Sequence, residues 1–322
     1  MRKGVKIAVI GGGSSYTPEL VEGLIKNYQS LPVKQLWLTD IEAGREKMEI
    51  AGNLARRMIA KAELPIEVTQ TLKRKEALID ADFVITQFRI GLLDARVKDE
   101  KLPLKHGILG QETTGPGGFF KALRTIPVVL DVCRDMEELC PDAWLINFAN
   151  PAGIITEAVL RHSNIKKAVG LCNVPVKMER AVAKLLNVHP SSRIHIDFAG
   201  LNHMVFGLSV SVDGVDVTQK IHNLLTAPQI ELMKKDIKRL GWEPEFIKEL
   251  EALPSPYYKY YIKTEDIVKV CKTEAAQSKT RAEVVKEIEK DLFTLYKDRS
   301  LAVKPHQLEE RGGPTTRKLP YA

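Results

Sequence analysis

The feature that most constrains the fold is an apolar strand that runs directly into a glycine-rich turn near the N-terminus. Val5–Ile10 is apolar except for Lys6, which predicts a strand buried on both faces, as in a parallel sheet. A helix is predicted from Tyr16 to Tyr28, and the turn between them consists of Gly11, Gly12, Gly13, Ser14 and Ser15. A strand, a glycine turn and a helix in this order begin a dinucleotide-binding βαβ unit, in which turn and helix N-terminus hold a pyrophosphate. The third glycine of the usual motif is replaced by Tyr16, so the turn alone is a weak signal.

A second signal is the acidic residue at the end of the next predicted strand, Gln35–Thr39. Asp40 at that point can accept hydrogen bonds from the ribose hydroxyls of a dinucleotide, and its charge would repel a 2′-phosphate. We therefore expect NAD rather than NADP. The simpler alternative is that Asp40 only caps the following helix.

Strands and helices alternate through the first half of the chain, which predicts a doubly wound parallel sheet of the α/β class. Further strands are expected at Ile66–Val68, Ala81–Gln87, Ala143–Phe148 and Lys167–Leu171. The glycine-rich segment 110–118 is expected to be a loop that precedes a helix over Phe119–Leu139.

Polar residues that follow the predicted strands are expected at the crevice where such sheets bind ligands. Asn150 and Cys172 each come after a strand, and Arg96 lies in a helix that opens after the fourth strand. Arg96 is therefore a candidate contact for an anion, although a solvated helix arginine is an equally simple interpretation.

Composition excludes several classes of protein. The chain has 322 residues with a net charge of +7, and no apolar run reaches membrane-spanning length. The first strand begins so close to Met1 that no signal peptide is expected. Its four cysteines show no spacing typical of a secreted disulfide scaffold, which favours the cytoplasm. No motif predicts binding to nucleic acid or to a membrane, and the positive charge favours an anionic small molecule.

The second half offers isolated residues with chemical potential. The segment 194–206 predicts an antiparallel strand pair with His203 at its bend. Spacing alone favours buried core positions for Cys172 and His203, although a thiolate and an imidazole would suit a transition metal. Four tyrosines occur between Tyr257 and Tyr261, and a phenol near a cation can act as a base. A last helix is expected over Arg281–Lys297, with core positions at Val284, Val285, Ile288, Leu292 and Tyr296.

Several motifs, taken together, resemble glycoside hydrolase family 4, and within it the bacterial 6-phospho-β-glucosidases. They are Ile10–Leu20, Gly110–Gly118, Asn147–Pro151, Gly170–Pro175 and Gly200–His203, and they occur in the family's order. The resemblance extends from residue 5 to about residue 313. It implies an NAD-binding Rossmann domain over residues 1–171, followed by an α+β domain of the lactate/malate dehydrogenase type over residues 172–322, which is incomplete in this chain.

The resemblance also implies an activity, the hydrolysis of 6-phospho-β-glucosides such as cellobiose 6-phosphate to glucose 6-phosphate and an aglycone. Most glycosidases use two carboxylates, and NAD-dependent members are an exception. In this chemistry NAD oxidises the sugar at C3, a base removes the proton on C2, and a divalent metal stabilises the enediolate. Elimination of the aglycone, addition of water and reduction of the ketone then regenerate NAD.

Site residues follow from the resemblance position by position. Gly11 to Ser15 and Asp40 correspond to the cofactor site, and Tyr257 to the base, with Tyr258 as the adjacent alternative. The resemblance assigns the metal, expected to be manganese, to Cys172 and His203, against the expectation from spacing. The residues assigned to the substrate are Arg96, Asn150, Asn173 and Arg281, with the two arginines on the sugar or its phosphate.

The residue after Cys172 favours the β-specific branch. Members specific for α-linkages have an aspartate there that acts as an acid, whereas Asn173 cannot donate a proton in that way. The leaving-group acid is then unassigned. The alternatives are a 6-phospho-α-glucosidase, a 2-hydroxy-acid dehydrogenase of the same fold, and an inactive NAD-binding remnant. For the dehydrogenase, His195 and Asp197 are a poor catalytic pair, because strand residues two apart share one face.

The chain departs from the family pattern after Gly313, where family members continue Ala-Tyr-Tyr-Ser and then a substantial further stretch. Residues 314–321 can be encoded by a DNA sequence that reads Tyr-Tyr-Ser-Glu-Ala-Ala-Tyr in another frame. We therefore expect a single-nucleotide frameshift, with apolar surface left exposed. In its full-length form the protein is expected to be a homodimer or homotetramer that acts on a phosphorylated disaccharide.

Overall fold

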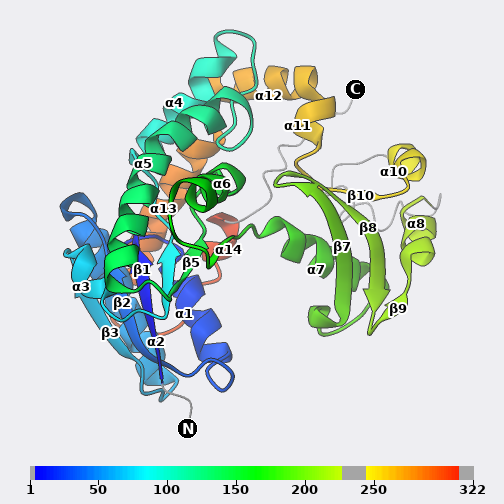
Figure 1. Ribbon diagram of the computed structural model, residues 1–322. Helices are drawn as coiled ribbons and strands as arrows, with labels where there is room; N and C mark the ends of the chain where they lie inside the picture. The colour runs from blue at the N-terminus through cyan, green and yellow to red at the C-terminus, as the bar shows by residue number, and fades with distance from the viewer. Residues whose placement is uncertain (1–3, 227–243, 312–322) are drawn as a thin grey trace. The chain divides into compact units, whose positions relative to one another are not determined.

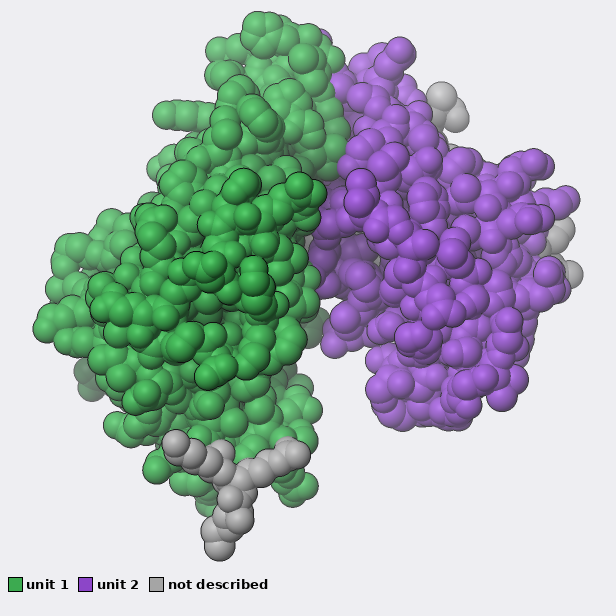
Figure 2. Space-filling view, viewed as in Figure 1, with its two compact units in different colours: residues 1–171, 273–313 green, residues 172–272, 314–322 purple. Residues whose placement is uncertain are grey.

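The computed structural model describes residues 4–226 and 244–311 of the chain. They form two compact units, which Figure 2 distinguishes by colour. Unit 1 runs up to Leu171 and resumes at Thr273, whereas unit 2 begins at Cys172 and runs to Lys272. Unit 2 is thus inserted into the sequence of unit 1.

Unit 1 contains a six-stranded sheet with the order β3-β2-β1-β4-β5-β6, in which every neighbouring pair is parallel (Figure 1). This is the strand order of a dinucleotide-binding fold, so the predicted doubly wound α/β sheet is confirmed. The strands are β1 (Val5–Ile10), β2 (Val33–Thr39), β3 (Glu67–Thr71), β4 (Phe83–Thr86), β5 (Trp144–Asn147) and β6 (Ala168–Gly170).

The register of the sheet aligns the carboxyl ends of its strands. Ile10 at the end of β1 pairs with Thr39 of β2 and with Thr86 of β4. Thr86 in turn pairs with Asn147 of β5, which pairs with Gly170 of β6. The loops that follow these strands therefore all begin at one edge of the sheet, which is where ligands bind in open α/β sheets.

Helices cover both faces of this sheet, because the apolar strands have two faces to bury. In β1, Ile7 and Val9 belong to one core cluster, whereas Ala8 and Ile10 belong to another. The helices of unit 1 are α1 (Thr17–Lys26), η1 (Glu42–Gly44), α2 (Arg45–Lys61), α3 (Arg74–Leu78), α4 (Leu92–Leu104), α5 (Gly115–Leu139), α6 (Ala152–His162), α13 (Arg281–Tyr296) and α14 (Leu308–Arg311).

Helix α13 belongs to unit 1, whereas the sequence assigns every residue after 171 to a second domain. Leu292, Phe293 and Tyr296 are buried in the same core cluster as the residues of α1, α2 and β2. Burial of these large apolar side chains attaches the helix to the first sheet. The prediction that Val284 faces the core is wrong, since this side chain is 38% exposed.

The prediction that the whole glycine-rich segment 110–118 is a loop is wrong, because α5 begins at Gly115. Pro116 stands in the first turn, where its missing N–H and fixed φ suit a helix start. A Cβ on Gly117 would lie 2.4 Å from the Gln111 carbonyl oxygen, and one on Gly118 would lie 2.2 Å from that of Thr113. These glycines therefore allow the helix to begin in close contact with the preceding backbone.

Unit 2 is built on an antiparallel sheet in which β8 lies between β10 and β7 and also pairs with β9. The expected strand pair with His203 at its bend is confirmed by β7 and β8. The elements of unit 2 are α7 (Val174–Leu186), η2 (Ser191–Arg193), β7 (Ile194–Leu201), β8 (Met204–Val212), β9 (Val215–Asp216), α8 (Thr218–Thr226), α10 (Pro244–Leu250), β10 (Leu253–Pro254), α11 (Lys259–Ile262) and α12 (Thr264–Ala276), whose last residues enter unit 1.

Side chains from α7, α8, α10 and the sheet form the core of unit 2, including Met178, Ile196, Val210, Ile221 and Ile247. The expected change of sequence after Gly313 lies outside the described residues. Within the described residues, no helix has the length and apolar character required to cross a membrane.

Candidate functional site

The glycine turn lies between the ends of β2 and β4, which leaves no room for side chains. A Cβ on Gly11, whose φ is +89°, would lie 2.8 Å from Phe88 Cβ, and one on Gly12 would lie 2.7 Å from Leu38 Cβ. The N–H groups of Gly11 and Gly12 both donate to the Thr39 carbonyl at 2.9 Å. The glycines thus let the turn pack on the second strand, close to the edge where the loops begin.

Asp40 braces this turn. Its Oδ2 accepts a hydrogen bond from the Gly13 N–H at 2.9 Å, and its Oδ1 accepts one from the Ile41 N–H at 2.9 Å. Neither bond caps the helix α2, so the simpler alternative raised by the sequence does not describe this residue. A carboxylate has about four acceptor positions. Asp40 therefore keeps acceptor capacity for ribose hydroxyls, and the turn with its acidic neighbour fits a dinucleotide.

Helix α13 holds the other end of the turn. The Tyr296 hydroxyl donates to the Ser15 carbonyl at 2.8 Å, and Ser15 Oγ lies 3.5 Å from Glu289 Oε2. Glu289 also pairs with Lys47 and Arg311, and these two cations hold the pKa of its carboxyl below the usual value although burial raises it. The glycine turn is therefore anchored to a helix that lies far from it in the sequence.

Arg96 is a buried residue with two carboxylate partners, contrary to the solvated alternative. Its Nε donates to Glu100 Oε1 at 2.8 Å, and its Nη1 lies 3.2 Å from Glu112 Oε1. Glu112 also receives Arg89 Nη1 at 2.6 Å and Lys121 Nζ at 2.7 Å. Three cations thus surround one carboxylate, and the cluster carries an excess of positive charge.

Burial and neighbouring charges shift the pKa values of Glu112 and Lys121 in this cluster. Burial raises the pKa of Glu112, but the charges of Arg89, Arg96 and Lys121 outweigh it and hold that pKa well below the ordinary value. Burial, followed by the charge of Arg89, lowers the pKa of Lys121 to about 7, although Glu112 opposes this shift. A group that is neutral in part at pH 7 reduces the repulsion between its cationic neighbours.

The sequence interpretation missed Arg89, Glu100, Glu112 and Lys121. A signal for two of them was present. Glu112 lies in the glycine-rich motif, and Glu100 follows Arg96 at the i, i+4 spacing of helical ion pairs. Arg89, in the loop before α4, and Lys121 of α5 had no such signal, because each meets Glu112 only in the folded chain.

Arg281 is the first residue of α13 and also lies in unit 1. Burial, followed by the charge of Arg96, lowers its pKa. Because that second cause requires proximity, the structure brings together the two arginines that the sequence assigns to the substrate. Arg281 Nη2 donates to the Arg311 carbonyl at 2.9 Å.

Asn150 follows β5 at the same edge of the sheet and is half-buried. The loop that carries it is held by Asn147, whose Oδ1 accepts hydrogen bonds from Thr86 Oγ1 at 2.8 Å and from the Ala149 N–H at 3.1 Å. Thr86 and Asn147 are both buried. Asn150 therefore extends from a rigid support.

Unit 2 brings Cys172 and His203 together. Cys172 Sγ lies 3.7 Å from His203 Nε2, although the residues are far apart in the sequence. His203 is 5% exposed and has a φ of +65° at the β7–β8 turn. A φ of this sign is uncommon for a residue with a side chain, and such outliers are concentrated at functional sites.

This donor pair fits a metal ion. Metal–sulfur and metal–nitrogen bonds of the lengths found for zinc, at a tetrahedral angle, place the two ligand atoms about 3.6 Å apart. Within the described residues, no group of three or more His, Cys, Asp or Glu side chains could hold a metal. Two protein ligands of this kind leave positions for oxygen ligands, which a manganese ion accepts readily.

Tyr257 stacks on His203. Its ring lies 3.6 Å from that of His203, with an interplanar angle of 15°. Tyr258 instead makes an edge contact with Phe206 at 4.9 Å. The contact with His203 distinguishes Tyr257 from its neighbour. Asn173 is exposed at the N-cap position of α7, and its side chain makes no capping hydrogen bond.

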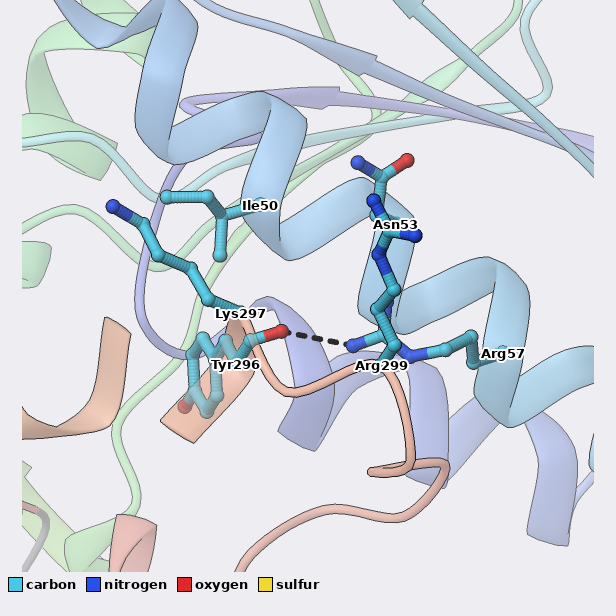
Figure 3. A pocket seen from close by; sticks show the side chains of 6 residues that line it. All are labelled: Ile50, Asn53, Arg57, Tyr296, Lys297 and Arg299. Carbon is cyan, nitrogen blue, oxygen red and sulfur yellow. Dashed lines mark hydrogen bonds between the residues drawn. The ribbon is translucent and has the colours of Figure 1, made fainter. Parts of the chain in front are cut away.

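A separate cavity of about 420 Å³ lies between α2 and the end of α13 (Figure 3). Arg57 donates to the Tyr296 carbonyl at 2.8 Å and to the Leu301 carbonyl at 2.7 Å. This arginine therefore joins the chain after α13 to α2. The cavity contains none of the residues assigned to the site.

Two family models match this chain. One, described as family 4 glycosyl hydrolase, matches residues 6–188, and the other, described as the C-terminal domain of that family, matches residues 198–319. The chain belongs to the family 4 glycosyl hydrolases. The resemblance seen in the sequence motifs is thereby confirmed.

This family 4 glycosyl hydrolase is similar to named relatives over nearly its whole length. It is 58% identical to a probable 6-phospho-beta-glucosidase of Bacillus subtilis strain 168 and 48% identical to the 6-phospho-beta-glucosidase of Escherichia coli strain K12. Each match covers 97% of this chain, with 71% and 70% of the relatives covered.

The fold likeness is equally broad. The 6-phospho-beta glucosidase of Thermotoga maritima, solved with manganese, NAD+ and glucose-6-phosphate, matches with a TM-score of 0.83 and 35% identity over 96% of this chain and 70% of that one. A lactate dehydrogenase from Eimeria maxima matches with a TM-score of 0.51 and 16% identity, over 83% of this chain and 76% of that one. The second likeness concerns the fold alone, and it confirms the expected dehydrogenase-like architecture.

The lowered pKa of Lys121 predicts a pH dependence of stability. Between pH 7 and the unfolded value of 10.5, the unfolded chain holds a proton on Lys121 that the folded chain releases, so the folded state gains stability as pH rises. Relative to Lys121→Met, the free energy of unfolding of the wild type should rise by up to about 1.4 kcal/mol per pH unit in this window. Urea unfolding at pH 6 to 9.5 measures both slopes, and equal slopes would contradict the prediction.

Proposed function

We propose that this chain is an NAD- and metal-dependent 6-phospho-β-glucosidase, which hydrolyses substrates such as cellobiose 6-phosphate. The observation that carries the proposal is the contact of Cys172 Sγ with His203 Nε2 at 3.7 Å, with Tyr257 stacked on that histidine. A thiolate and an imidazole beside a phenol form a metal site next to a base. The chain's membership of family 4 and the names of its relatives support this interpretation.

The proposed chemistry divides between the cofactors and the side chains that hold the metal and move the proton. When bound, NAD supplies reversible hydride transfer at C3 of the sugar, and the metal, expected to be manganese, supplies Lewis-acid stabilisation of negative charge. Cys172 and His203 hold the metal. Tyr257, as the phenolate, takes the proton from C2 and becomes the neutral phenol, and loss of that proton allows the aglycone to leave from C1.

Unit 1 contributes the residues that bind and orient. The turn from Gly11 to Ser15, with Asp40, holds the dinucleotide, and Asn150 contacts the sugar. Arg96 and Arg281 face the sugar or its phosphate, and the positive excess around Glu112 favours an anionic substrate. Asn173 of unit 2 is a further substrate contact.

Specificity for the β-linkage rests on two arguments. An asparagine at position 173 offers no acid to protonate an α-linked leaving group. Sequence identity is 58% and 48% to the β-glucosidases of Bacillus subtilis and Escherichia coli, but 33% to a 6-phospho-alpha-glucosidase of Lacticaseibacillus paracasei. The dehydrogenase alternative lacks support, because the contact of His195 with Asp197 at 3.1 Å is exposed on both sides. Acid–base chemistry of that kind requires a site protected from water.

We further propose that the protein acts in the reducing cytoplasm. Cys133, Cys140, Cys172 and Cys271 are all free thiols. A metal-binding Cys172 must stay reduced, because only the thiolate is a ligand. Assembly into a homodimer or homotetramer stays a prediction.

Isotope exchange tests the reaction type. With NAD, Mn²⁺ and reductant, the chain should hydrolyse a chromogenic β-glucoside 6-phosphate, and in heavy water the glucose 6-phosphate formed should carry deuterium at C2, because the C2 proton is removed and replaced. NMR of the product measures this, with glucose 6-phosphate incubated under the same conditions as the control for later exchange. Hydrolysis without C2 deuterium, or turnover that persists without NAD and after chelation, would overturn the mechanism. NAD binding by calorimetry with no turnover at any metal concentration would support the inactive remnant.

A matched pair of tyrosine variants tests the base. Tyr257→Phe should lower kcat by about 10²- to 10⁴-fold, the usual contribution of a general base. Tyr258→Phe should leave kcat within a few-fold, because its ring contacts Phe206 rather than His203. The reverse order of effects would transfer the base to Tyr258.

Metal binding tests the ligand pair without relying on activity. Cys172→Ser and His203→Gln should each weaken Mn²⁺ binding by at least about tenfold, because each removes one donor and leaves one. Cys271→Ser replaces a buried cysteine of α12 and should leave the affinity unchanged. Titration followed by electron paramagnetic resonance measures all three, and equal affinities in Cys172→Ser and Cys271→Ser would exclude Cys172 as a ligand.

A further inference from the structure

One buried carboxylate joins Arg96 to the backbone next to Arg281, and both arginines are assigned to the substrate. Glu100 is 2% exposed and stands in the last turns of α4. An ionised carboxylate at such a depth is stable only if its oxygens are fully engaged. The partners of Glu100 therefore indicate what this residue does.

Each oxygen of Glu100 has its own partner, and the two partners belong to different elements. Oε1 accepts the Nε hydrogen of Arg96 at 2.8 Å, within α4. Oε2 accepts the backbone N–H of Ala282 at 2.9 Å, in the first turn of α13. Ala282 is fully buried and directly follows Arg281. One side chain thus fixes the guanidinium of Arg96 and the backbone beside Arg281.

Arg96 has little freedom to turn away from this arrangement. Its second contact, from Nη1 to Glu112 Oε1, lies on another nitrogen of the same planar group. Two carboxylates on two nitrogens of one guanidinium define the plane in which it lies. Glu100 and Glu112 together therefore contribute to fixing the orientation of the Arg96 guanidinium.

The helix start that carries Arg281 is also well defined. Thr280 and Glu283 form a capping box, in which the Thr280 hydroxyl accepts from the Glu283 N–H and Glu283 Oε2 accepts from the Thr280 N–H. The N–H of Ala282 points out of this first turn to Glu100, where a negative charge is favoured by the helix dipole. Arg281 and Arg96 are close enough for their charges to repel, and the negative charge of Glu100 opposes that repulsion.

We propose that Glu100 is a positioning residue that aligns Arg96 and Arg281 for the phosphate of a 6-phosphorylated sugar. This inference rests on the proposed function, and it assigns Glu100 no contact with the substrate. A phosphate needs donors in a fixed arrangement, and a carboxylate that holds one guanidinium directly and the other through its backbone provides it. Loss of the alignment removes binding that substrate and transition state share, so it raises KM more than it lowers kcat.

The variant Glu100→Gln tests this alignment, because it keeps the volume of the side chain and removes its charge and one acceptor. We expect KM for the chromogenic β-glucoside 6-phosphate to rise by about tenfold or more, the usual effect of losing a charge-assisted hydrogen bond, with kcat within about threefold. The affinity for NAD, measured by calorimetry, should be unchanged. Glu100→Asp retains the charge but cannot reach both donors, so KM should rise in this variant as well. It replaces the glutamine variant as the test if the glutamine variant fails to bind NAD.

Glu283→Gln is the matched control. It lies in the same first turn of α13 and loses its charge opposite Lys101, yet glutamine still serves in a capping box. Its KM should equal that of the wild type. A KM that rises equally in Glu283→Gln and Glu100→Gln would attribute the effect to a disturbed helix start, and an unchanged KM in Glu100→Gln with NAD bound would overturn the proposal.

A structural readout separates this inference from the proposed function. In the wild type the Arg96 Nε–H should give a resolved side-chain NMR signal, and the Ala282 amide should exchange slowly with solvent. At least one of the two should be lost in Glu100→Gln, which keeps a single acceptor oxygen, and both should be kept in Glu283→Gln. If the wild type hydrolyses no 6-phosphoglucoside, the proposed function fails, and retention of both signals in Glu100→Gln then overturns the positioning role independently.

Discussion

The common register of the six parallel strands is the constraint on which the site in unit 1 depends. Because Ile10, Thr39, Thr86, Asn147 and Gly170 are linked pairwise across the sheet, the loops after them start side by side. Backbone hydrogen bonds enforce this alignment, and a shift by one residue would turn the apolar side chains of a buried strand to the wrong faces. The glycine turn, Asp40 and the support of Asn150 all inherit their positions from it. The strand register thus brings loops with different side chains together, although the paired strand backbones themselves carry no reactive group.

Buried carboxylates are the second feature that organises unit 1, because they connect elements that are distant in the sequence. Each deeply placed carboxylate is shared between elements: Glu112 between α4 and α5, Glu100 between α4 and α13, and Glu289 between the glycine turn, α2 and α14. Removing one partner of such a group leaves a desolvated charge, which costs about 3–5 kcal/mol. The shared carboxylates therefore specify how the helices are docked. The same contacts hold guanidinium groups at the edge where the loops begin.

Most of the sheet and the glycine turn could be predicted from the sequence, because both depend on local pattern. The apolar run of β1 and the glycines after it are contiguous in the sequence. The alternation of predicted strands and helices along the chain then predicts a parallel sheet. The membership of α13 in unit 1 could not be read in this way, since its Leu292 and Tyr296 meet the core of the first sheet only after a whole unit has intervened. The start of α5 could not be predicted, because glycine disfavours a helix locally and the close backbone contacts that require glycine at 117 and 118 exist only in the folded chain. Among site residues, Cys172 and His203 were indicated by family motifs and not by spacing. Lys121 gave no local signal, because the charges that act on it, those of Arg89, Arg96 and Glu112, lie on α4 and on the loops that precede α4 and α5.

The insertion of unit 2 between β6 and α13 has a consequence for how the chain is made. A ribosome releases the strands of the first sheet early, but the cluster that covers one face of that sheet still lacks Leu292, Phe293 and Tyr296. About a hundred residues must be synthesised before those side chains emerge, which takes roughly 5–20 s at ordinary rates of translation. During that interval the nascent sheet lacks the cover that α13 gives to one of its apolar faces. The described core of unit 2 draws on residues 172–258 alone, so this core can form before the first sheet is completed, although the first sheet begins earlier in the sequence.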